Sequence, residues 1–349
     1  MPPSRSTLFA AVRNTRSRSN ATFNRPSPSA VCGVFQRCLG RVPTPEEQQA
    51  TSWQAVFTHV AQAPPPPRRG TAGTAVVLML FHNNATYVQH TLPRLMRATR
   101  NAANRCGLAT IWYFYENDST DGTPERLRAL RSRSVHVCTE QTQAAAHGVE
   151  LSRTEERATR MSRLRNALLG MALADVAVAD AVLCIDTNVW FRECDVAQLL
   201  ACVLARPDVG LVGACTMDVR NVSHYYDTYA YESLDEMPGQ SVDRITCPWS
   251  RCDQCRWRRG QAAPLAPGPL HFVASCFGGL AAVQPAALLR ARWSSVQRAC
   301  EHVALCAAMR QAGFAVAVLP AARALWSATF PRTRQLLISL HALAVEKKI

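Results

Sequence analysis

Short apolar runs alternate with longer amphipathic stretches between Ala75 and Leu319, and this alternation constrains the fold of the chain more than any other feature. Ala75–Phe81 is apolar throughout, which is typical of a strand buried on both faces. Leu92–Arg105 has its apolar residues on one side, which is typical of a helix that covers a sheet. The alternation predicts an α/β fold with a mostly parallel sheet flanked by helices. Other strands are predicted at 111–115, 135–138, 181–185, 209–215, 271–274, 280–283 and 314–319, and other helices from Thr123, over 161–171, after a capping Asp195, and over 300–311 before a C-terminal Gly313.

Composition divides the chain into four segments. Residues 1–43 are rich in serine, arginine and proline, and we predict a disordered basic tail. Residues 44–70 are predicted to form an amphipathic helix, with an apolar stripe over Trp53–Val60, followed by a proline linker. Residues 71–330 are predicted to form a single globular domain, and residues 331–349 a C-terminal tail.

The positive charge of the chain is concentrated ahead of this domain. The formal net charge is +14, from 39 basic and 25 acidic residues. Residues 1–70 contain nine arginines against two acids, Glu46 and Glu47, and so carry half of the excess. A charge gathered in a tail is weak support for nucleic-acid binding by the domain, so no nucleic-acid partner is expected.

No stretch of the sequence has the pattern of a transmembrane anchor or of a signal-peptide core. Most of the 14 cysteines lie inside apolar segments, where a free thiol behaves as a small hydrophobic group. Both observations favour a reduced, cytoplasmic protein. Residues 5–41 contain arginine and serine but no acid, and an organelle transit peptide is the alternative for them.

Polar side chains follow three of the predicted strands, at the edge where an open parallel sheet binds ligands. Asn83 follows the first strand, and Glu116 and Asp118 follow the second. Their carboxylates could accept hydrogen bonds from a nucleobase or a ribose. Asp186 and Asn188 follow the fourth strand, where their oxygens suit Mg²⁺ or Mn²⁺ completed by phosphate oxygens. A turn or a helix cap is the alternative for Asp186.

Four further positions carry possible chemistry. Arg165 and Asn166 lie on a predicted helix and suit a diphosphate, although a helical arginine is more often a solvated surface charge. Glu301 is the only acid between Asp253 and Glu346. It is either a helix-capping acid or a general base, and the adjacent His302 is a candidate metal ligand or phosphate contact.

Three other groups remain open from the residues alone. Gly278 and Gly279 either allow a ligand to approach the backbone or form a tight turn. Asp227 lies among tyrosines that are either the floor of a sugar site or packed aromatics. Cys247, Cys252 and Cys255 suggest zinc, but a structural zinc site takes four ligands. The sequence contains no Walker, dinucleotide-binding, zinc-protease or serine-hydrolase motif.

In combination these motifs resemble a glycosyltransferase of the GT-A fold. Tyr115–Thr123 looks like the nucleotide-binding segment of such enzymes, Arg165–Leu168 like their Arg-Asn-x-Leu helix, and Asp186–Asn188 stands where a metal-binding Asp-x-Asp motif is expected. The chain also resembles the fungal capsule-associated alpha-1,3-mannosyltransferases, because segments of that subgroup are similar in order and spacing to Tyr226–Thr228, Ser275–Gly279 and Cys300–His302.

This resemblance implies a Rossmann-like GT-A domain that moves a hexose, mannose being one candidate, from a nucleotide diphosphate sugar to a hydroxyl of a glycan or glycoprotein. Glu116, Asp118 and Asn83 would contact the donor with Asn166, Gly278 and Gly279, and Arg165 would contact its diphosphate. Asp186, Asn188 and His302 would hold Mn²⁺ or Mg²⁺, and Glu301 or Asp227 would face the acceptor. Asn188 departs from the family pattern, since a neutral amide replaces the usual acid. The alternative is a degenerate domain used as a scaffold, or a zinc- or nucleic-acid-binding module.

Overall fold

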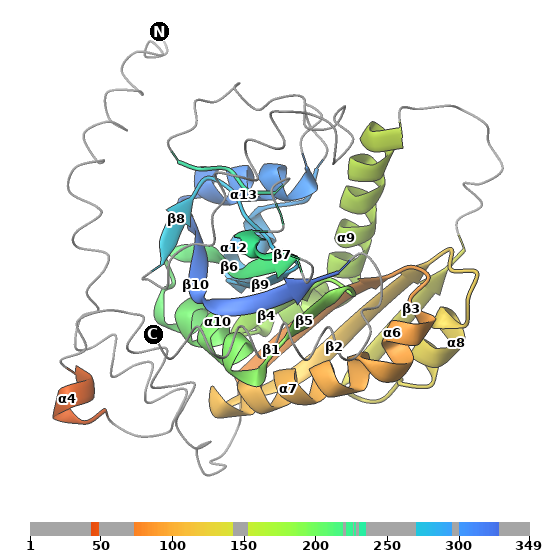
Figure 1. The fold of residues 1–349 in the computed structure, drawn as a ribbon, viewed down its shortest axis with the longest axis horizontal. Helices are drawn as coiled ribbons and strands as arrows, with labels where there is room; N and C mark the ends of the chain where they lie inside the picture. The colour runs from red at the N-terminus through yellow and green to blue at the C-terminus, as the bar shows by residue number, and fades with distance from the viewer. Residues whose placement is uncertain are drawn as a thin grey trace, which may run out of the picture.

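A computed structural model gives the fold and describes residues 43–48, 73–141, 153–218, 221–225, 227, 230–234, 270–294 and 300–327 (Figure 1). Nearly all of the predicted basic tail, the Trp53–Val60 stripe, the Cys247–Cys255 cluster and the C-terminal tail lie outside these residues. The start of the amphipathic helix predicted within residues 44–70 lies within them, and α4 (Pro45–Gln48) begins there.

The strands of the described chain form one ten-stranded sheet. They are β1 (Gly73–Phe81), β2 (Leu108–Asn117), β3 (Val135–Glu140), β4 (Ala181–Ile185), β5 (Val189–Phe191), β6 (Val209–Asp218), β7 (Asn221–Tyr225), β8 (His271–Val273), β9 (Leu280–Val283) and β10 (Ala315–Trp326). Their order is β3-β2-β1-β4-β9-β6-β10-β5, with β7 beside β6 and β8 beside β10.

The sheet is mixed, whereas the sequence predicts a mostly parallel one. Strands β3, β2, β1 and β4 are parallel, as are β6 and β10. Strand β9 runs antiparallel to both β4 and β6, and β5, β7 and β8 are also antiparallel to their partners. An apolar run buried on both faces has the same composition in either direction, so the runs do not reveal strand direction. The α/β class with flanking helices is confirmed.

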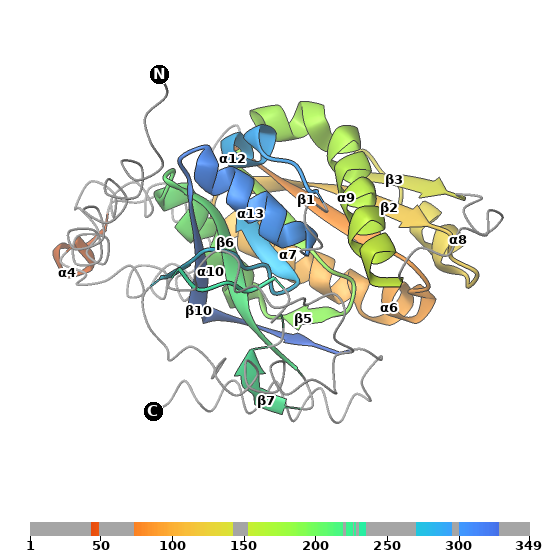
Figure 2. The same cartoon turned by 90° about the horizontal axis from the view of Figure 1, so that it is seen from above.

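Helices cover both faces of the sheet (Figure 2). They are α6 (Ala85–His90), α7 (Leu92–Arg105), α8 (Thr123–Arg128), α9 (Arg153–Val178), α10 (Glu193–Ala205), α12 (Pro285–Arg290) and α13 (Glu301–Gln311). One hydrophobic core joins the sheet to α6, α7 and α10, and a second joins it to α9, α12 and α13. Among the described helices, none combines the length and the apolar character needed to cross a bilayer.

Several predicted boundaries are confirmed. Helix α7 spans the predicted Leu92–Arg105, with its predicted apolar side buried. Helix α13 ends before Gly313, whose φ of 91° is the left-handed conformation expected of a C-terminal glycine.

Asp195 has a different role from the predicted one. It is the third residue of α10, and the preceding Arg192 is the cap. Its fully buried carboxylate accepts hydrogen bonds from the Arg192 main-chain N–H at 3.0 Å and from the Arg323 main-chain N–H at 3.1 Å. An acid in the first turn is as favourable as one at the cap, which is why the sequence pattern did not separate the two positions.

Strand β10 is longer than predicted because it continues through Pro320. The pairing of β10 with β6 shifts between Leu319 and Arg323, and a proline is tolerated in a strand at such an irregularity.

Strand β5, with only three residues, and the short helices α6 and α12 were not predicted. Elements this short carry too few residues for a periodic pattern.

Candidate active site

One arginine and two acids meet where β4, α9 and α13 converge. Asp186 directly follows β4, Arg165 lies midway along α9, and Glu301 is the first residue of α13. The Arg165 Nη2 donates to Asp186 Oδ1 at 3.2 Å, and its Nε donates to Glu301 Oε1, also at 3.2 Å. A single guanidinium therefore bridges two acids that the sequence assigns to different tasks.

The three members of this cluster differ in exposure. The Arg165 and Glu301 side chains are only 8% and 10% exposed, whereas that of Asp186 is 31% exposed. Asp186 is therefore the member that a bound ligand reaches first. Arg165 also lies over the Phe277 ring, 5.0 Å from its centroid, so an aromatic face supports the guanidinium.

Burial and charge act in opposite directions on the two acids. Burial raises the pKa of Asp186, and Arg165 lowers it only in part because Glu301 adds a second negative charge. Burial alone would also raise the pKa of Glu301, but Arg165, through its charge and its hydrogen bond, and the Glu301 main-chain N–H act against burial, and the pKa lies below its usual range. Glu301 is consequently ionised at neutral pH.

Asp227 completes the acidic group. Its carboxylate accepts hydrogen bonds from the main-chain N–H groups of Gly278 at 3.0 Å and Ala230 at 3.3 Å. Burial raises the pKa of Asp227 to about 6, and the charges of Asp186 and Glu301 add to the effect. A carboxyl with this pKa can hold or release a proton near neutral pH.

Gly278 and Gly279 form the tight turn that the sequence allows, with φ of 70° and 74°. The Asp186 N–H donates to the Gly279 carbonyl at 2.8 Å. A Cβ added at Gly279 would lie 2.5 Å from Val189 Cγ2, so this position has neither the conformation nor the space for a side chain. The glycine pair therefore allows β9 to begin directly beside Asp186.

Asn166 and His302 lie behind the cluster. The Asn166 amide donates to the Trp293 carbonyl at 2.8 Å and accepts from the Trp293 main-chain N–H at 3.2 Å. Both the oxygen and the nitrogen of this amide are therefore bonded to Trp293, whereas the resemblance implies that Asn166 contacts the nucleotide sugar. The His302 ring is only 3% exposed and stacks on Phe277 with ring centroids 3.8 Å apart. Nothing in the sequence pattern pointed to Trp293.

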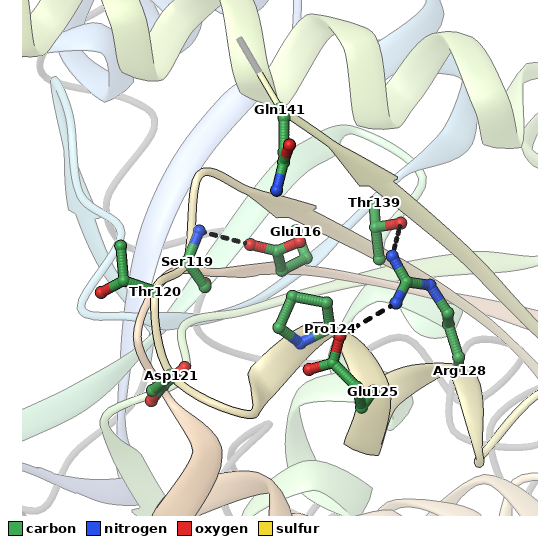
Figure 3. A pocket seen from close by; sticks show the side chains of 9 residues that line it. All are labelled: Glu116, Ser119, Thr120, Asp121, Pro124, Glu125, Arg128, Thr139 and Gln141. Carbon is green, nitrogen blue, oxygen red and sulfur yellow. Dashed lines mark hydrogen bonds and ion pairs between the residues drawn. The ribbon is translucent and has the colours of Figure 1, made fainter. Parts of the chain in front are cut away.

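A separate polar pocket of about 310 Å³ opens at the ends of β2 and β3 and the start of α8 (Figure 3). Glu116 lies in it, and one of its carboxylate oxygens accepts a hydrogen bond from the Ser119 N–H at 2.8 Å. Arg128 reaches in from α8 and donates to Thr139 at 2.9 Å and to Glu125 at 3.2 Å. The other lining residues are Thr120, Asp121, Pro124 and Gln141.

Asn83 and Asp118 build the loops beside this pocket and do not line it. Both have left-handed backbones, with φ of 50° and 53°. The Asn83 side-chain oxygen accepts from the Thr120 N–H at 2.9 Å, and its main-chain N–H donates to the Ser119 hydroxyl at 2.9 Å. Asn83 thus fixes the loop after β2 to the loop after β1.

The oxygen-rich surroundings of Asp186 fit a hard divalent cation whose shell is completed by phosphate oxygens. Asp186 and Glu301 share one buried guanidinium, and Asp227 adds a third carboxyl group whose pKa both of them raise, so the group carries an excess of negative charge. The half-buried Asn188 offers a neutral oxygen two residues from Asp186. Within the described ranges, no three His, Cys, Asp or Glu side chains are grouped to hold a metal by themselves.

Residues 78–310, more than half of the chain, match the family model described as Cryptococcal mannosyltransferase 1. Among curated proteins, none matches this sequence. In solved structures, the fold is similar to a mannosyltransferase, PcManGT from Pyrobaculum calidifontis, in complex with GDP-Man and Mn²⁺, at 13% identity and a TM-score of 0.44, covering 91% of this chain and 73% of that one. It is also similar to GalNAc-T7 with UDP, GalNAc and Mn²⁺, at 14% identity and a TM-score of 0.45, covering 92% of this chain and 61% of that one.

Proposed function

This chain belongs to the Cryptococcal mannosyltransferase 1 family of glycosyltransferases, and from that membership we propose that it moves a mannosyl group from a nucleotide diphosphate sugar to a glycan hydroxyl with the help of a divalent cation. The family description supports mannose as the hexose. The acid and arginine groups at the strand ends support the nucleotide diphosphate and the cation.

The observation that carries the proposal is the separation of the polar pocket from the Arg165 cluster. The pocket lies at the end of β2 and the cluster at the end of β4, with β1 between them. Adjacent strands are about 4.8 Å apart, so roughly 10 Å separates the two strand ends. A nucleoside in the pocket and a diphosphate directed toward Asp186 would span a gap of that size.

Each group then has a defined role in the proposal. Glu116 would accept hydrogen bonds from the nucleoside in the pocket, and Asp118, on the adjoining loop, would contact the ribose. Arg165 holds diphosphate oxygens through hydrogen bonds from its guanidinium, and these bonds are stronger because the side chain is buried away from water. Asp186 and Asn188 would hold Mn²⁺ or Mg²⁺, which when bound offsets the charge on the departing diphosphate.

Glu301 and Asp227 face the acceptor in this proposal. Glu301 is ionised at neutral pH and can accept the proton of an acceptor hydroxyl if the reaction inverts the sugar. Asp227, whose pKa is about 6, is the alternative base. Gly278 holds the Asp227 carboxylate through its N–H, which links the position of this acid to the turn before β9.

The test measures sugar release from a panel of nucleotide sugars by purified protein, with manganese and with a chelator. We expect cation-dependent hydrolysis, strongest with a mannose donor, and its loss by at least about 100-fold in Asp186→Asn. Asp208→Asn is the matched control, because Asp208 also pairs with an arginine, Arg206 at 2.6 Å, but directly before the start of β6. No hydrolysis of any donor by the wild-type protein would refute the proposal, as would equal activity in the two variants.

A further inference from the structure

A line of contacts leads from α9 to Glu301 through residues that the proposed function leaves without a task. It begins at Asn166, which clamps both main-chain polar groups of Trp293. The Trp293 indole Nε1 then donates to His302 Nδ1 at 3.5 Å. His302 Nε2 in turn lies 3.4 Å from Glu301 Oε1. Asn166 is thus connected to Glu301 through Trp293 and His302, in addition to the direct contact between the neighbouring Arg165 and Glu301.

The donor at Trp293 determines where the His302 proton resides. An indole N–H can only donate, so His302 Nδ1 must present its lone pair. A neutral imidazole then carries its proton on Nε2, which is the atom that faces Glu301. Burial and the nearby Arg165 charge together lower the pKa of His302 to about 3, so the ring is neutral at physiological pH.

The ring itself is held in place. Its face stacks on Phe277 at an interplanar angle of 11°, and Arg165 lies over the same Phe277 ring. Arg165 and His302 approach the same Glu301 oxygen, at 3.2 Å and 3.4 Å. Nε2 makes no hydrogen bond within the part of the chain that the structure describes, and contacts of this kind often tighten only when substrate binds.

We propose that His302 is a positioning residue for Glu301, held by Trp293 with its proton on Nε2, and that it is not a ligand of the cation. Metal binding by His302 would need the lone pair on Nε2, because Trp293 already occupies the lone pair of Nδ1. The Nε2–H directs Glu301 Oε1, and Oε2, to which the Cys300 thiol donates at 3.5 Å, would face the acceptor hydroxyl. This inference rests on the proposed function of Glu301, and it deepens that function.

The tautomer can be measured without any turnover. Nitrogen-15 NMR of labelled histidine distinguishes a protonated ring nitrogen from one with a lone pair, and the His302→Gln spectrum identifies the His302 signal among nine histidines. We expect Nδ1 to be unprotonated and Nε2 to be protonated near neutral pH. Replacing Trp293 by Phe removes the indole donor and keeps an aromatic ring, so the nitrogen-15 shift of the unprotonated Nδ1 should change in Trp293→Phe, because its lone pair loses a hydrogen bond. A proton on Nδ1 in the wild-type protein would overturn the proposal.

Kinetics separate positioning from metal binding. His302→Phe keeps the stack on Phe277 and removes both ring nitrogens, so turnover should fall about 10- to 100-fold while the manganese concentration for half-maximal activity stays unchanged. His302→Gln places a neutral amide N–H near the position of Nε2 and should restore most of that loss. His136→Phe is the control, since His136 also stacks on an aromatic ring, Tyr113 at 4.7 Å, but on β3.

A rise of about tenfold or more in the manganese requirement of both His302 variants would overturn the proposal, because it would identify a metal ligand. Failure of His302→Gln to restore turnover would also count against it. An inactive wild-type protein would refute the proposed function, and the tautomer measurement would then decide the placement of the proton alone.

Discussion

Replacing Gly279 by alanine tests the most confined position of the site. Gly279 has a φ of 74°, and an L-residue in the left-handed region costs roughly 1–2 kcal/mol. The added Cβ would also lie 2.5 Å from Val189 Cγ2, and overpacking of a buried contact costs roughly 1–3 kcal/mol. We therefore expect Gly279→Ala to lower the free energy of unfolding by roughly 2–5 kcal/mol.

Gly313 provides a control that separates these two costs. Its φ is 91°, but a Cβ added there would have no neighbour within 4 Å. Gly313→Ala should therefore lose only the conformational part, roughly 1–2 kcal/mol. The difference between the two variants isolates the clash with Val189.

Urea unfolding of both variants, read as a change in midpoint at constant slope, measures these losses. A Val189→Ala change in the Gly279→Ala background should recover part of the loss, with a coupling of about 1 kcal/mol or more. Turnover should fall as well, because the Asp186 N–H is bonded to the Gly279 carbonyl. Equal destabilisation by Gly279→Ala and Gly313→Ala would refute the reasoning.

Three other variants test separate features. Glu301→Gln should lower sugar transfer about 100-fold or more with little change in nucleotide affinity, and normal transfer would reduce Glu301 to a helix cap. Gly170→Ala should raise the free energy of unfolding by about 0.8–1 kcal/mol, because a Cβ within α9 meets no atom within 4 Å; a loss of stability in urea would contradict this. The pKa of Asp121 is lowered: burial would raise it, but hydrogen bonds from Thr123 and Ala85 outweigh burial. A carboxyl group whose pKa is lowered in the folded protein stabilises the fold at pH values above its ordinary pKa of 3.8, and this stabilisation is lost as the pH falls below that value. The wild-type protein should therefore lose its higher stability over Asp121→Asn as the pH is lowered in acid unfolding. An unchanged difference between these two proteins down to pH 3 would be the contrary result.

The sequence predicts the buried strands well because each is an uninterrupted apolar run. Strands β1 and β4 agree with prediction to within two residues, and β9 agrees at both ends. Strand direction was not predictable from the runs, because it depends on which strands become neighbours. β9 is the example: it is inserted antiparallel between β4 and β6, although residues 219–279 lie between it and β6 in the chain.

The chemical groups of the site were predictable, but their contacts were not. Asp186 and Glu301 stand out as acids at the end of a strand and the start of a helix, and Arg165 belongs to the segment that resembles an Arg-Asn-x-Leu helix. Their meeting depends on a pairing of residues 136 positions apart, which no local pattern encodes. The tautomer of His302 depends on the orientation of the Trp293 ring, and that orientation is set by tertiary packing.

The insertion of β9 also bears on how the chain folds. Until β9 docks, β4 and β6 each have an unpaired edge, and exposed edges of this kind favour aggregation. β9 lies late in the chain, so a nascent protein has completed β4 and β6 well before the strand that joins them is synthesised. The same docking step places the Gly279 carbonyl against Asp186. The docking of β9 therefore joins β4 to β6 and positions Asp186 in one late, long-range event, and partly synthesised chains should depend on protection of both edges until it occurs.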